Sequence, residues 1–438
     1  MFYVDSVNDV LTETTNQGTD TVSMYGVVSN SYTLGANLEN LEANDAMAAS
    51  GDIVTLNGNG LNNVLMGGYS GHRFVLNGGD GNDTLYAGSD RDTLSGGSGN
   101  DEYHIGSNQT VIVETQGPWT SPYYVTPGGY DTVHLGTGGT YDFSTVFVEA
   151  FRAEGGAVNV TGNASSNNFF GSTGNDRFVS GAGDDYAYGG AGSDTLVAGT
   201  GYDVLWGGAG VDTYEVDLSL GGETEVVPAE RDGDVLVING VSSVNNLRFT
   251  RVVSQMGEGD THNYWDWGPG NALMISTTNG SGYVVINEYF NSDGSFNGGI
   301  SAIRVGGTTL SFNDVKAAVT RPGTTGNDLM FGFSLGENLA GGDGDDTIDG
   351  GGGHDTFIGN NTNHGYYNTI KESNGGTATL QAGVDNAFVG FGGNFSAATG
   401  VTTIDTNGHS GVTIGSNGSA LDLSHVAIID SSGHGNGV

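Results

Sequence analysis

The feature that most constrains this chain is a nine-residue register that recurs twelve times in three clusters. The clusters cover residues 78–104, 171–215 and 323–358, and two of their units read GGDGNDTLY (78–86) and GGAGSDTLV (189–197). Position six is acidic in every unit, and position eight is apolar or aromatic. A repeat of this period predicts an elongated array of stacked units rather than a set of ordinary globular domains.

Glycine usage agrees with this interpretation. The 438 residues include 80 glycines but only 6 prolines. Glycine does not fall at every third position, so a collagen triple helix is excluded. Within the repeat, glycines supply the backbone freedom that a tight turn and a close chain approach need. The last three residues of each unit are expected to form a short strand whose middle side chain points inward.

These units resemble the G-G-x-G-x-D-x-U-x nonapeptide of RTX (hemolysin-type calcium-binding) repeat proteins of bacteria. The resemblance implies an all-β fold, in which parallel β-roll or β-helix solenoid segments are joined by small β-rich modules. Two units would make one coil of about eighteen residues. We expect seven segments: RTX-associated β modules at 1–57 and 105–161, β-rolls at 58–104, 162–215 and 323–360, a hemolysin-type-related β module at 216–322, and a Gly/Ser/Thr-rich β-coil tail at 361–438.

Two degenerate units, GNGLNNVLM and GNASSNNFF, have Asn63 and Asn167 at the acidic position. We interpret them as capping coils that keep the packing shape without the charge. The segment 216–322 contains four strand-like stretches, DVLVING, NALMIST, GYVVINEYF and SAIRVGG. Close to its end, NDVKAAV (313–319) predicts a short helix.

The charge balance is strongly acidic, with 50 acidic and 11 basic residues and a net charge of −39. This excess argues against binding to nucleic acids or anionic membranes, which need clustered Lys and Arg. Such a chain repels itself unless cations neutralise it. The acids stand singly beside glycines at regular positions, which favours ordered metal sites. There are no cysteines, so neither disulfides nor thiolate metal sites are available.

Acids in successive coils are expected to lie one strand spacing apart, roughly 5 Å. Two carboxylates so close repel each other unless a hard cation lies between them, and Ca²⁺ accepts carboxylate and backbone carbonyl oxygens in irregular geometry. In the RTX family the first coil gives the carbonyls of positions two and four and its acid, and the second gives those of positions one and three and its acid. The resemblance thus implies these calcium ligands: Gly79, Gly81, Asp83, Gly96, Ser98 and Asp101; Ser172, Gly174, Asp176, Gly189, Ala191 and Asp194; Gly181, Gly183, Asp185, Ala198, Thr200 and Asp203; Gly190, Gly192, Asp194, Gly207, Ala209 and Asp212; Thr324, Gly326, Asp328, Gly341, Asp343 and Asp346; Glu337, Gly350, Gly352 and Asp355.

The stretch GFSLG in the third cluster matches the G-x-S-x-G nucleophile elbow of serine hydrolases. Its Ser334 stands at position three of an in-phase unit, and the following GGDGDDTID cannot form the helix that an elbow requires. The same unit has bulky Phe333 and Leu335 in the turn and Glu337 as its acid, so it predicts the weakest calcium site. Asp92, which has no acidic partner eighteen residues on, is expected to form half a site.

Catalytic motifs are absent from the sequence. No H-E-x-x-H zinc motif occurs, and the nine histidines are dispersed with no pair at metal-ligand spacing. The candidates for an acid–base pair outside the repeats are Asp260, Asp266 and Glu288, and nothing in the sequence brings them together. We expect no enzymatic activity.

Two aromatic-rich stretches leave an alternative open. GPWTSPYYVTPGGY (117–130) and GDTHNYWDWGPG (259–270) hold three of the four tryptophans. Exposed aromatic rings stack on sugars, whereas buried rings at hairpin tips would cover the roll. Replacement of Trp265 and Trp267 would distinguish sugar-binding rings from rings that only cover the roll.

The expected function is that of a secreted, extracellular calcium-binding protein that folds when calcium binds, with a structural or adhesive role. Alternatives are a non-catalytic accessory part of a secreted hydrolase or polysaccharide-modifying enzyme, and a glycan-binding module. Expected partners are several calcium ions and surface polysaccharide or other RTX chains, with no nucleic acid and no membrane insertion. The resemblance implies type I secretion, and the first residues contain no apolar signal-peptide region.

Overall fold

The computed structural model describes most of the chain: residues 1–6, 8–15, 18–25, 30–43, 53–68, 72–88, 91–114, 128–228, 232–252, 272–278, 280–291, 295–319, 329–332, 337–359, 367–372, 376–391, 399–416 and 422–429. It forms two compact units, Met1–Gly240 and Val241–Val438. No helix among these residues is both long and apolar enough to cross a membrane.

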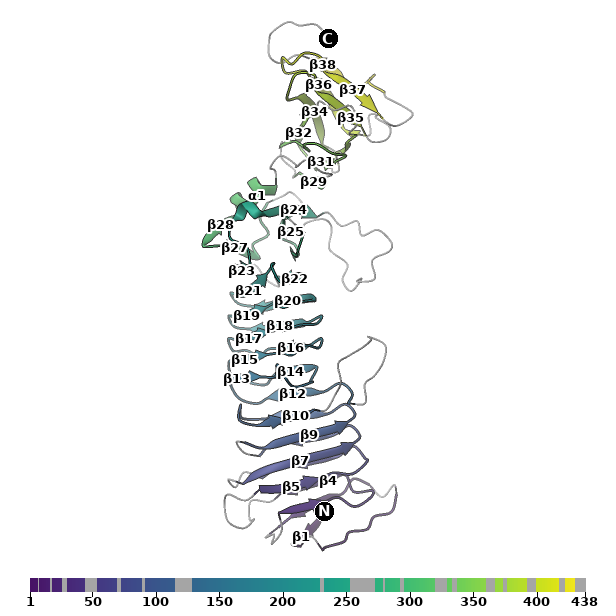
Figure 1. Cartoon of the computed structure of the whole chain (residues 1–438), viewed down its shortest axis with the longest axis vertical. Coiled ribbons are helices and arrows are strands. Elements are labelled where there is room, and N and C mark those ends of the chain that lie inside the picture. Colours follow the sequence, from purple (N-terminus) through teal and green to yellow (C-terminus); the bar gives the residue numbers. More distant parts are fainter. Residues whose placement is uncertain are drawn as a thin grey trace. The chain divides into compact units, whose positions relative to one another are not determined.

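The first unit is a solenoid of short parallel strands stacked coil upon coil (Figure 1). Its first sheet contains, in spatial order, β1 (Phe2–Val4), β2 (Thr21–Met24), β4 (Asn40–Ala43), β6 (Val64–Met66), β8 (Thr84–Tyr86), β10 (Glu102–Ile105), β12 (Thr132–Leu135), β14 (Ala150–Ala153), β16 (Asn168–Phe170), β18 (Tyr186–Ala191), β20 (Tyr202–Ala209) and β22 (Glu223–Val227).

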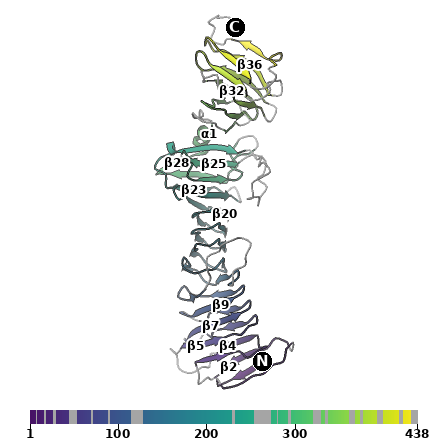
Figure 2. The ribbon, with the colours of Figure 1, turned by 45° about the vertical axis from the view of Figure 1, so that its right-hand side comes forward.

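The strands between these form two further rows in the same unit. One row contains β3 (Ser31–Thr33), β5 (Ile53–Asn57), β7 (Arg73–Asp80), β9 (Thr93–Ser98) and β11 (Val111–Ile112). The other contains β13 (Gly139–Asp142), β15 (Val158–Thr161), β17 (Arg177–Val179), β19 (Thr195–Val197), β21 (Thr213–Asp217) and β23 (Asp234–Asn239). Figure 2 shows the same stack of strands from a second direction.

The predicted coil of two nonapeptides is confirmed by the strand register. Leu85 pairs with Tyr103, and Phe178 pairs with Leu196, eighteen residues further along in both cases. These position-eight side chains are fully buried. The rings of Phe169 and Phe178 stack with centroids 4.9 Å apart, so facing sheets share one narrow core. The fold is therefore an all-β parallel solenoid, as the repeats predict.

The interpretation of the asparagine units as capping coils is wrong. Asn63 precedes β6, which lies between β4 and β8, and Asn167 precedes β16, which lies between β14 and β18. Both units are thus interior coils of the sheet. The chain between 105 and 161 contributes β12 and β14 to the same sheet, because longer loops leave the strand register intact.

The second unit begins with two sets of antiparallel strands. In one set, β25 (Ala272–Thr277) pairs with β24 (Leu247–Val252) and β26 (Tyr283–Ile286), and in the other β27 (Ile300–Val305) pairs with β28 (Thr308–Leu310). A 3₁₀ turn η1 (Val244–Asn246) precedes β24, and helix α1 (Phe312–Val319) follows β28. The predicted helix is confirmed. It begins with a capping box, since Asp314 Oδ2 accepts from the Ser311 N–H at 2.8 Å and Ser311 Oγ accepts from the Asp314 N–H at 3.4 Å.

The rest of the second unit is again built of parallel strands. Its strands are β29 (Leu329–Phe331), β31 (Thr347–Asp349) and β33 (Thr369–Lys371); β30 (Asn338–Leu339), β32 (His354–Gly359), β34 (Thr377–Ala382), β36 (Val401–Asp405) and β38 (Ala427–Ile429); and β35 (Phe388–Phe391) and β37 (Thr413–Ser416). Leu339, Ile348, Phe357, Leu380 and Ile404 form its buried core.

Candidate metal centre

One oxygen of each repeat acid holds the neighbouring coil in register. The backbone N–H of Asp83 donates to Asp101 Oδ1 at 2.7 Å. In the second roll, the Asp176 N–H donates to Asp194 Oδ1 at 2.7 Å and the Asp194 N–H to Asp212 Oδ1 at 2.8 Å. Asp83, Asp101, Asp176, Asp194 and Asp212 each immediately precede a strand, so this bond joins successive coils where the strands begin. The carboxylate therefore helps to hold the coils together through this hydrogen bond, which does not involve a metal ion.

The same ladder continues through a segment for which the sequence predicts a connecting module. The Asp101 N–H donates to Asp131 Oδ1 at 2.9 Å, and the Asp131 N–H donates to Glu149 Oε2 at 2.8 Å. Further on, the Asn167 N–H donates to Asp185 Oδ1 at 2.6 Å. Sequence reasoning missed Asp131 and Glu149, because the loop before Asp131 lengthens its separation from Asp101 to 30 residues. The repeat-like GGYDTV around Asp131 was the available signal.

The second oxygen of these acids has a different environment. In six acids of the first unit the Oδ2 atom is buried and has no hydrogen-bond partner among the described residues: Asp83, Asp101, Asp131, Asp185, Asp194 and Asp212. The described ion pairs include no Lys or Arg on any of these six. A buried anionic oxygen without a partner is costly, so this row of atoms requires protons or cations.

The free oxygens of Asp83 and Asp194 face the backbone of the next coil. A Cβ atom added to Gly78 would collide with Asp83 Oδ2 and would lie 2.7 Å from the Gly96 carbonyl oxygen. The two oxygens thus converge on the space that glycine leaves empty. In the second roll Asp194 Oδ2 converges with the Gly207 carbonyl in the same way. Asp176 Oδ2, which accepts the Ser172 N–H, also lies close to the Gly189 carbonyl. These are acid and position-one carbonyl ligands that the sequence assigns to common sites.

The remaining predicted carbonyls also lie between coils. A Cβ on Gly97 or Gly99 would collide with the carbonyl oxygen of Gly79 or Gly81, respectively. Three of the position-three carbonyl oxygens accept a hydrogen bond from a backbone N–H of the preceding coil. The N–H groups of Gly81, Gly183 and Gly192 donate to the carbonyls of Ser98, Thr200 and Ala209, respectively, at 2.8–2.9 Å. A carbonyl oxygen has two lone pairs, so each retains one for a metal ion.

The turns fall into two classes that the repeat pattern alone does not separate. In open turns, the position-two glycine has a φ between +96° and +118°, and the acid keeps a free Oδ2: Gly79, Gly97, Gly181, Gly190 and Gly208. In closed turns, position two has no such φ and its N–H donates to Oδ2 of the acid: Gly88 to Asp92 (3.0 Å), Ser172 to Asp176 (2.7 Å) and Gly199 to Asp203 (2.9 Å). An N–H thus takes the place that a cation would occupy in an open turn.

Burial sets the protonation of the open turns. Desolvation raises the pKa of Asp101, Asp194 and Asp212 to about 7, although backbone hydrogen bonds to Oδ1 oppose the shift. The pKa of Asp131 is raised further, to about 9, by burial and by the nearby carboxylates of Glu114 and Glu149. Buried like charges favour the neutral form unless a cation compensates them.

The third roll supplies an extra acid. Glu337 Oε2 and the Gly350 carbonyl oxygen both lie close to the position that a Cβ atom at Gly332 would take. A Cβ on Gly350 would in turn meet both Asp355 Oδ2 and Glu372 Oε1. Burial and the neighbouring carboxylates raise the pKa of Glu372 to about 8. Glu372 lies seventeen residues after Asp355, one short of the repeat spacing, so its position in the sequence did not reveal it.

Several predicted residues lie outside the described part of the chain. They are Thr324, Gly326 and Asp328, Phe333 to Leu335 with Ser334, Asp260 and Asp266, and Trp265 and Trp267. Among the described ones, Asp343 and Glu288 are exposed. The prediction that the Glu337 site is the weakest stays a prediction.

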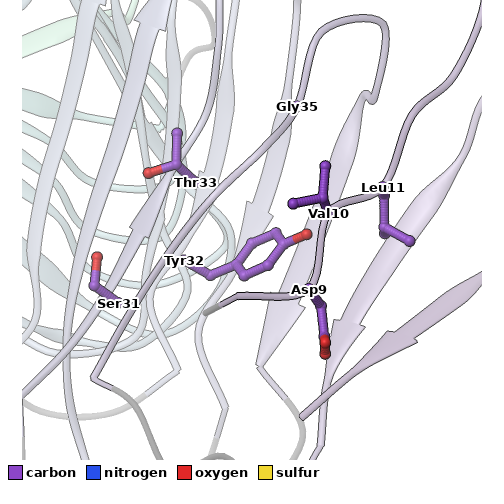
Figure 3. A pocket seen from close by; sticks show the side chains of 7 residues that line it. All are labelled: Asp9, Val10, Leu11, Ser31, Tyr32, Thr33 and Gly35. Carbon is purple, nitrogen blue, oxygen red and sulfur yellow. The ribbon is translucent and has the colours of Figure 1, made fainter. Parts of the chain in front are cut away.

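A pocket of about 470 Å³ lies away from the repeats (Figure 3). The ring of Tyr32 extends toward the segment that carries Asp9 and Val10. Asp9 Oδ2 already accepts the backbone N–H groups of Asp5 and Ser6, at 3.0 and 3.1 Å. Its carboxylate is therefore used by a local turn.

The open turns fit calcium. They offer a carboxylate oxygen without a partner, a converging backbone carbonyl and further carbonyls in the same turn, which is the all-oxygen ligand set that Ca²⁺ prefers. Residues that would hold the ion are the acids and turn carbonyls of two successive coils. The bound ion would supply the positive charge that the buried carboxylates lack.

The two classes of turn predict opposite effects of substitution at position two. Gly190→Ala places a side chain in the left-handed region and against the Ser172 carbonyl, so the open turn is strained by about 1–3 kcal/mol. We expect a higher calcium midpoint by isothermal titration calorimetry. Ser172→Gly removes the side chain that disfavours a positive φ, and we expect a lower midpoint.

Gly155→Ala is the matched control, because a Cβ at Gly155 meets nothing within 4 Å. Its calcium midpoint should equal that of the unmodified chain. If Gly190→Ala binds calcium as the control does, the conformation at position two does not set the affinity.

A family model of the RTX calcium-binding nonapeptide repeat matches the chain in four copies, at residues 75–103, 161–196, 188–218 and 331–363. No curated protein sequence matches the chain. The matched stretches contain the open turns of Asp83 and Asp194 in the first unit and the turn of Asp355 in the second. The chain therefore contains RTX calcium-binding nonapeptide repeats, and these repeats form coils of the parallel β-roll.

Proposed function

We propose that this chain is an extracellular scaffold, structural or adhesive, that folds when calcium enters its open turns. The observation that carries the proposal is the row of buried Oδ2 atoms without a described partner. In the folded chain the free oxygens of Asp83 and Asp194 lie beside the carbonyls of the next coil. The unfolded chain does not assemble them.

The energetics follow from this arrangement. Folding without metal must bury several carboxylates in one row, at the cost of desolvation and mutual repulsion. The net charge of −39 adds self-repulsion along the whole chain. A calcium ion removes these costs locally, and because its ligands come together only on folding, its binding free energy becomes folding free energy.

The required calcium concentration suggests where the chain folds. Extracellular calcium modules bind at about 10⁻⁴–10⁻³ M. At the much lower calcium of a cytosol, such sites stay empty and the chain remains expanded. This behaviour is compatible with export of an unfolded chain by type I secretion, followed by folding outside the cell. We propose no catalytic activity, and an accessory role beside a secreted enzyme is the alternative assignment.

A second candidate function is glycan binding, for which the outer face of the first sheet gives a specific observation. One residue per coil projects from this face in register, and we call these residues the outer row: Met66, Tyr86, His104, His134, Arg152, Phe170, Tyr188 and Trp206. Arg152 stacks over Phe170 at 4.3 Å, and Tyr188 contacts Trp206 edge to face at 5.4 Å. Half-buried rings in a row suit the stacking of sugar rings.

Trp206→Ala tests the glycan candidate. If the outer row binds sugars, the substitution should remove signals that the unmodified chain gives on a polysaccharide array in millimolar calcium. Met66→Ala, in the same row without an aromatic ring, is the control and should leave binding unchanged. Absence of binding by the unmodified chain, or equal binding by Trp206→Ala, would exclude this candidate.

Calcium titration followed by far-ultraviolet circular dichroism tests the main proposal. In metal-free buffer at pH 8 we expect an expanded chain with little strand signal. Millimolar calcium should produce the strand signal cooperatively, and equal magnesium should not, since Mg²⁺ demands a stricter octahedral geometry. A chain that is equally folded in metal-free and calcium-containing buffer would refute calcium-triggered folding.

The raised carboxyl pKa values predict how pH acts on the metal-free chain. The pKa of Asp101, Asp194 and Asp212 is about 7 in the folded chain, against an ordinary aspartate value of 3.8, so the folded state binds more protons. This contribution to stability is complete below pH 4 and is lost as pH rises through about 7. Metal-free chain should therefore gain strand signal between pH 8 and pH 5, while its calcium midpoint rises because protons compete for Oδ2. A metal-free chain that loses structure over this interval would contradict the burial of these acids.

A further inference from the structure

Two histidines that are thirty residues apart in sequence lie side by side on the outer row. His104 of β10 pairs in register with His134 of β12. Their rings stack with centroids 4.2 Å apart and an interplanar angle of 16°. Tyr86 stacks on the other face of His104, with ring centroids 4.2 Å apart. The site lies on the strands and is separate from the calcium turns.

A carboxylate fixes the orientation of the histidine rings. Glu154 Oε1 lies 2.8 Å from His134 Nδ1 and 4.0 Å from His104 Nδ1. The short contact places a proton on His134 Nδ1 and leaves a lone pair on Nε2. A carboxylate on the far nitrogen is the usual partner of a metal-bound histidine, because it sets the tautomer and increases ligand basicity.

The Nε2 atoms face a space without hydrogen-bond partners. His104 Nε2 and His134 Nε2 are both buried and bond to nothing among the described residues. Glu102 Oε2 lies 3.8 Å from His104 Nε2 on the same strand. One potential ligand atom from each of Glu102, His104 and His134 falls within 4.8 Å of the other two.

We propose that Glu102, His104 and His134 bind a divalent transition-metal ion of the imidazole-preferring class, such as Zn²⁺, at a site distinct from the calcium turns. Imidazole nitrogens suit zinc, copper and nickel, whereas Ca²⁺ takes oxygen ligands. Three protein ligands leave one position of a tetrahedral zinc ion for water.

Binding requires a small contraction of the cluster. Ligand atoms of a tetrahedral zinc ion lie about 3.3 Å apart, given zinc–nitrogen distances of about 2.0–2.1 Å. The present spread is up to 4.8 Å, so the side chains must rotate toward one another. Glu102 is exposed and the histidines are only partly buried, so rotation of the side chains can achieve this while the paired strands stay in register.

Titration calorimetry of the full chain, folded in millimolar calcium, with zinc chloride tests the proposal. We expect one high-affinity zinc ion per chain. His104→Ala combined with His134→Ala should abolish this event. Glu154→Gln, which keeps the shape but removes the charge behind the ring, should weaken zinc binding about 10–100-fold. The calcium-dependent circular dichroism of each variant must match that of the unmodified chain. A variant that meets this condition has lost zinc binding without losing its fold. The same spectra show whether calcium-triggered folding fails independently of zinc binding.

His409→Gln is the matched control. His409 Nδ1 also lies near a carboxylate, Asp385 Oδ1 at 3.3 Å. Among the described residues, however, His409 belongs to no cluster of three potential metal ligands. Its replacement should leave the zinc affinity unchanged. The visible absorption of Co²⁺ gives an independent readout, since tetrahedral nitrogen ligation should yield an intense band that the double variant lacks. Absence of zinc binding by the unmodified chain, or equal affinity in the double variant, would overturn the proposal.

Discussion

The structure depends on how the buried carboxylates between successive coils are satisfied. Each acid uses one oxygen to accept the backbone N–H of the preceding coil, and this bond holds the strands in register. The other oxygen can bind a proton, a cation or a nearby N–H group. Because the same bond links several successive coils, a change at one turn affects the stacking of its neighbours.

The chain contains coils that satisfy this requirement internally. Asn167 accepts the Asn163 N–H at 2.9 Å and donates to the Val148 carbonyl at 2.9 Å, so an uncharged amide replaces both acid and ion. Asn63 does the same with the Asn59 N–H at 2.7 Å and the Glu39 carbonyl at 3.1 Å. Each precedes a run of acidic coils. The roll therefore combines coils whose asparagine side chain is satisfied within the chain and coils whose buried carboxylate oxygen has no described partner.

Much of this architecture could be predicted from the sequence, because the period of nine fixes which residues share a face. The coil, the inward side chains and the acids at position six follow directly from it. Asp131 and Asp234 were missed because longer loops separate them from the acids to which they bond, Asp101 and Asp212, by 30 and 22 residues. His104 and His134 meet across the same enlarged coil.

Which turns are open and which are closed could not be predicted from the sequence. Gly181 and Gly199 are both glycines at position two, yet only the first has a positive φ. Glycine permits either conformation, so the residue type does not decide between them. Ser172 is the exception, since a side chain disfavours the open form and the sequence therefore carries the information.

The central claim is that calcium binds between coils at the free carboxylate oxygens. Anomalous diffraction from crystals grown in millimolar calcium tests this most directly. The account predicts ions about 2.3–2.6 Å from Oδ2 of Asp83 and Asp194, each also contacting the position-one carbonyl of the next coil. Ions found only on exposed acids such as Asp80 and Asp184, with no metal at the buried oxygens, would contradict it.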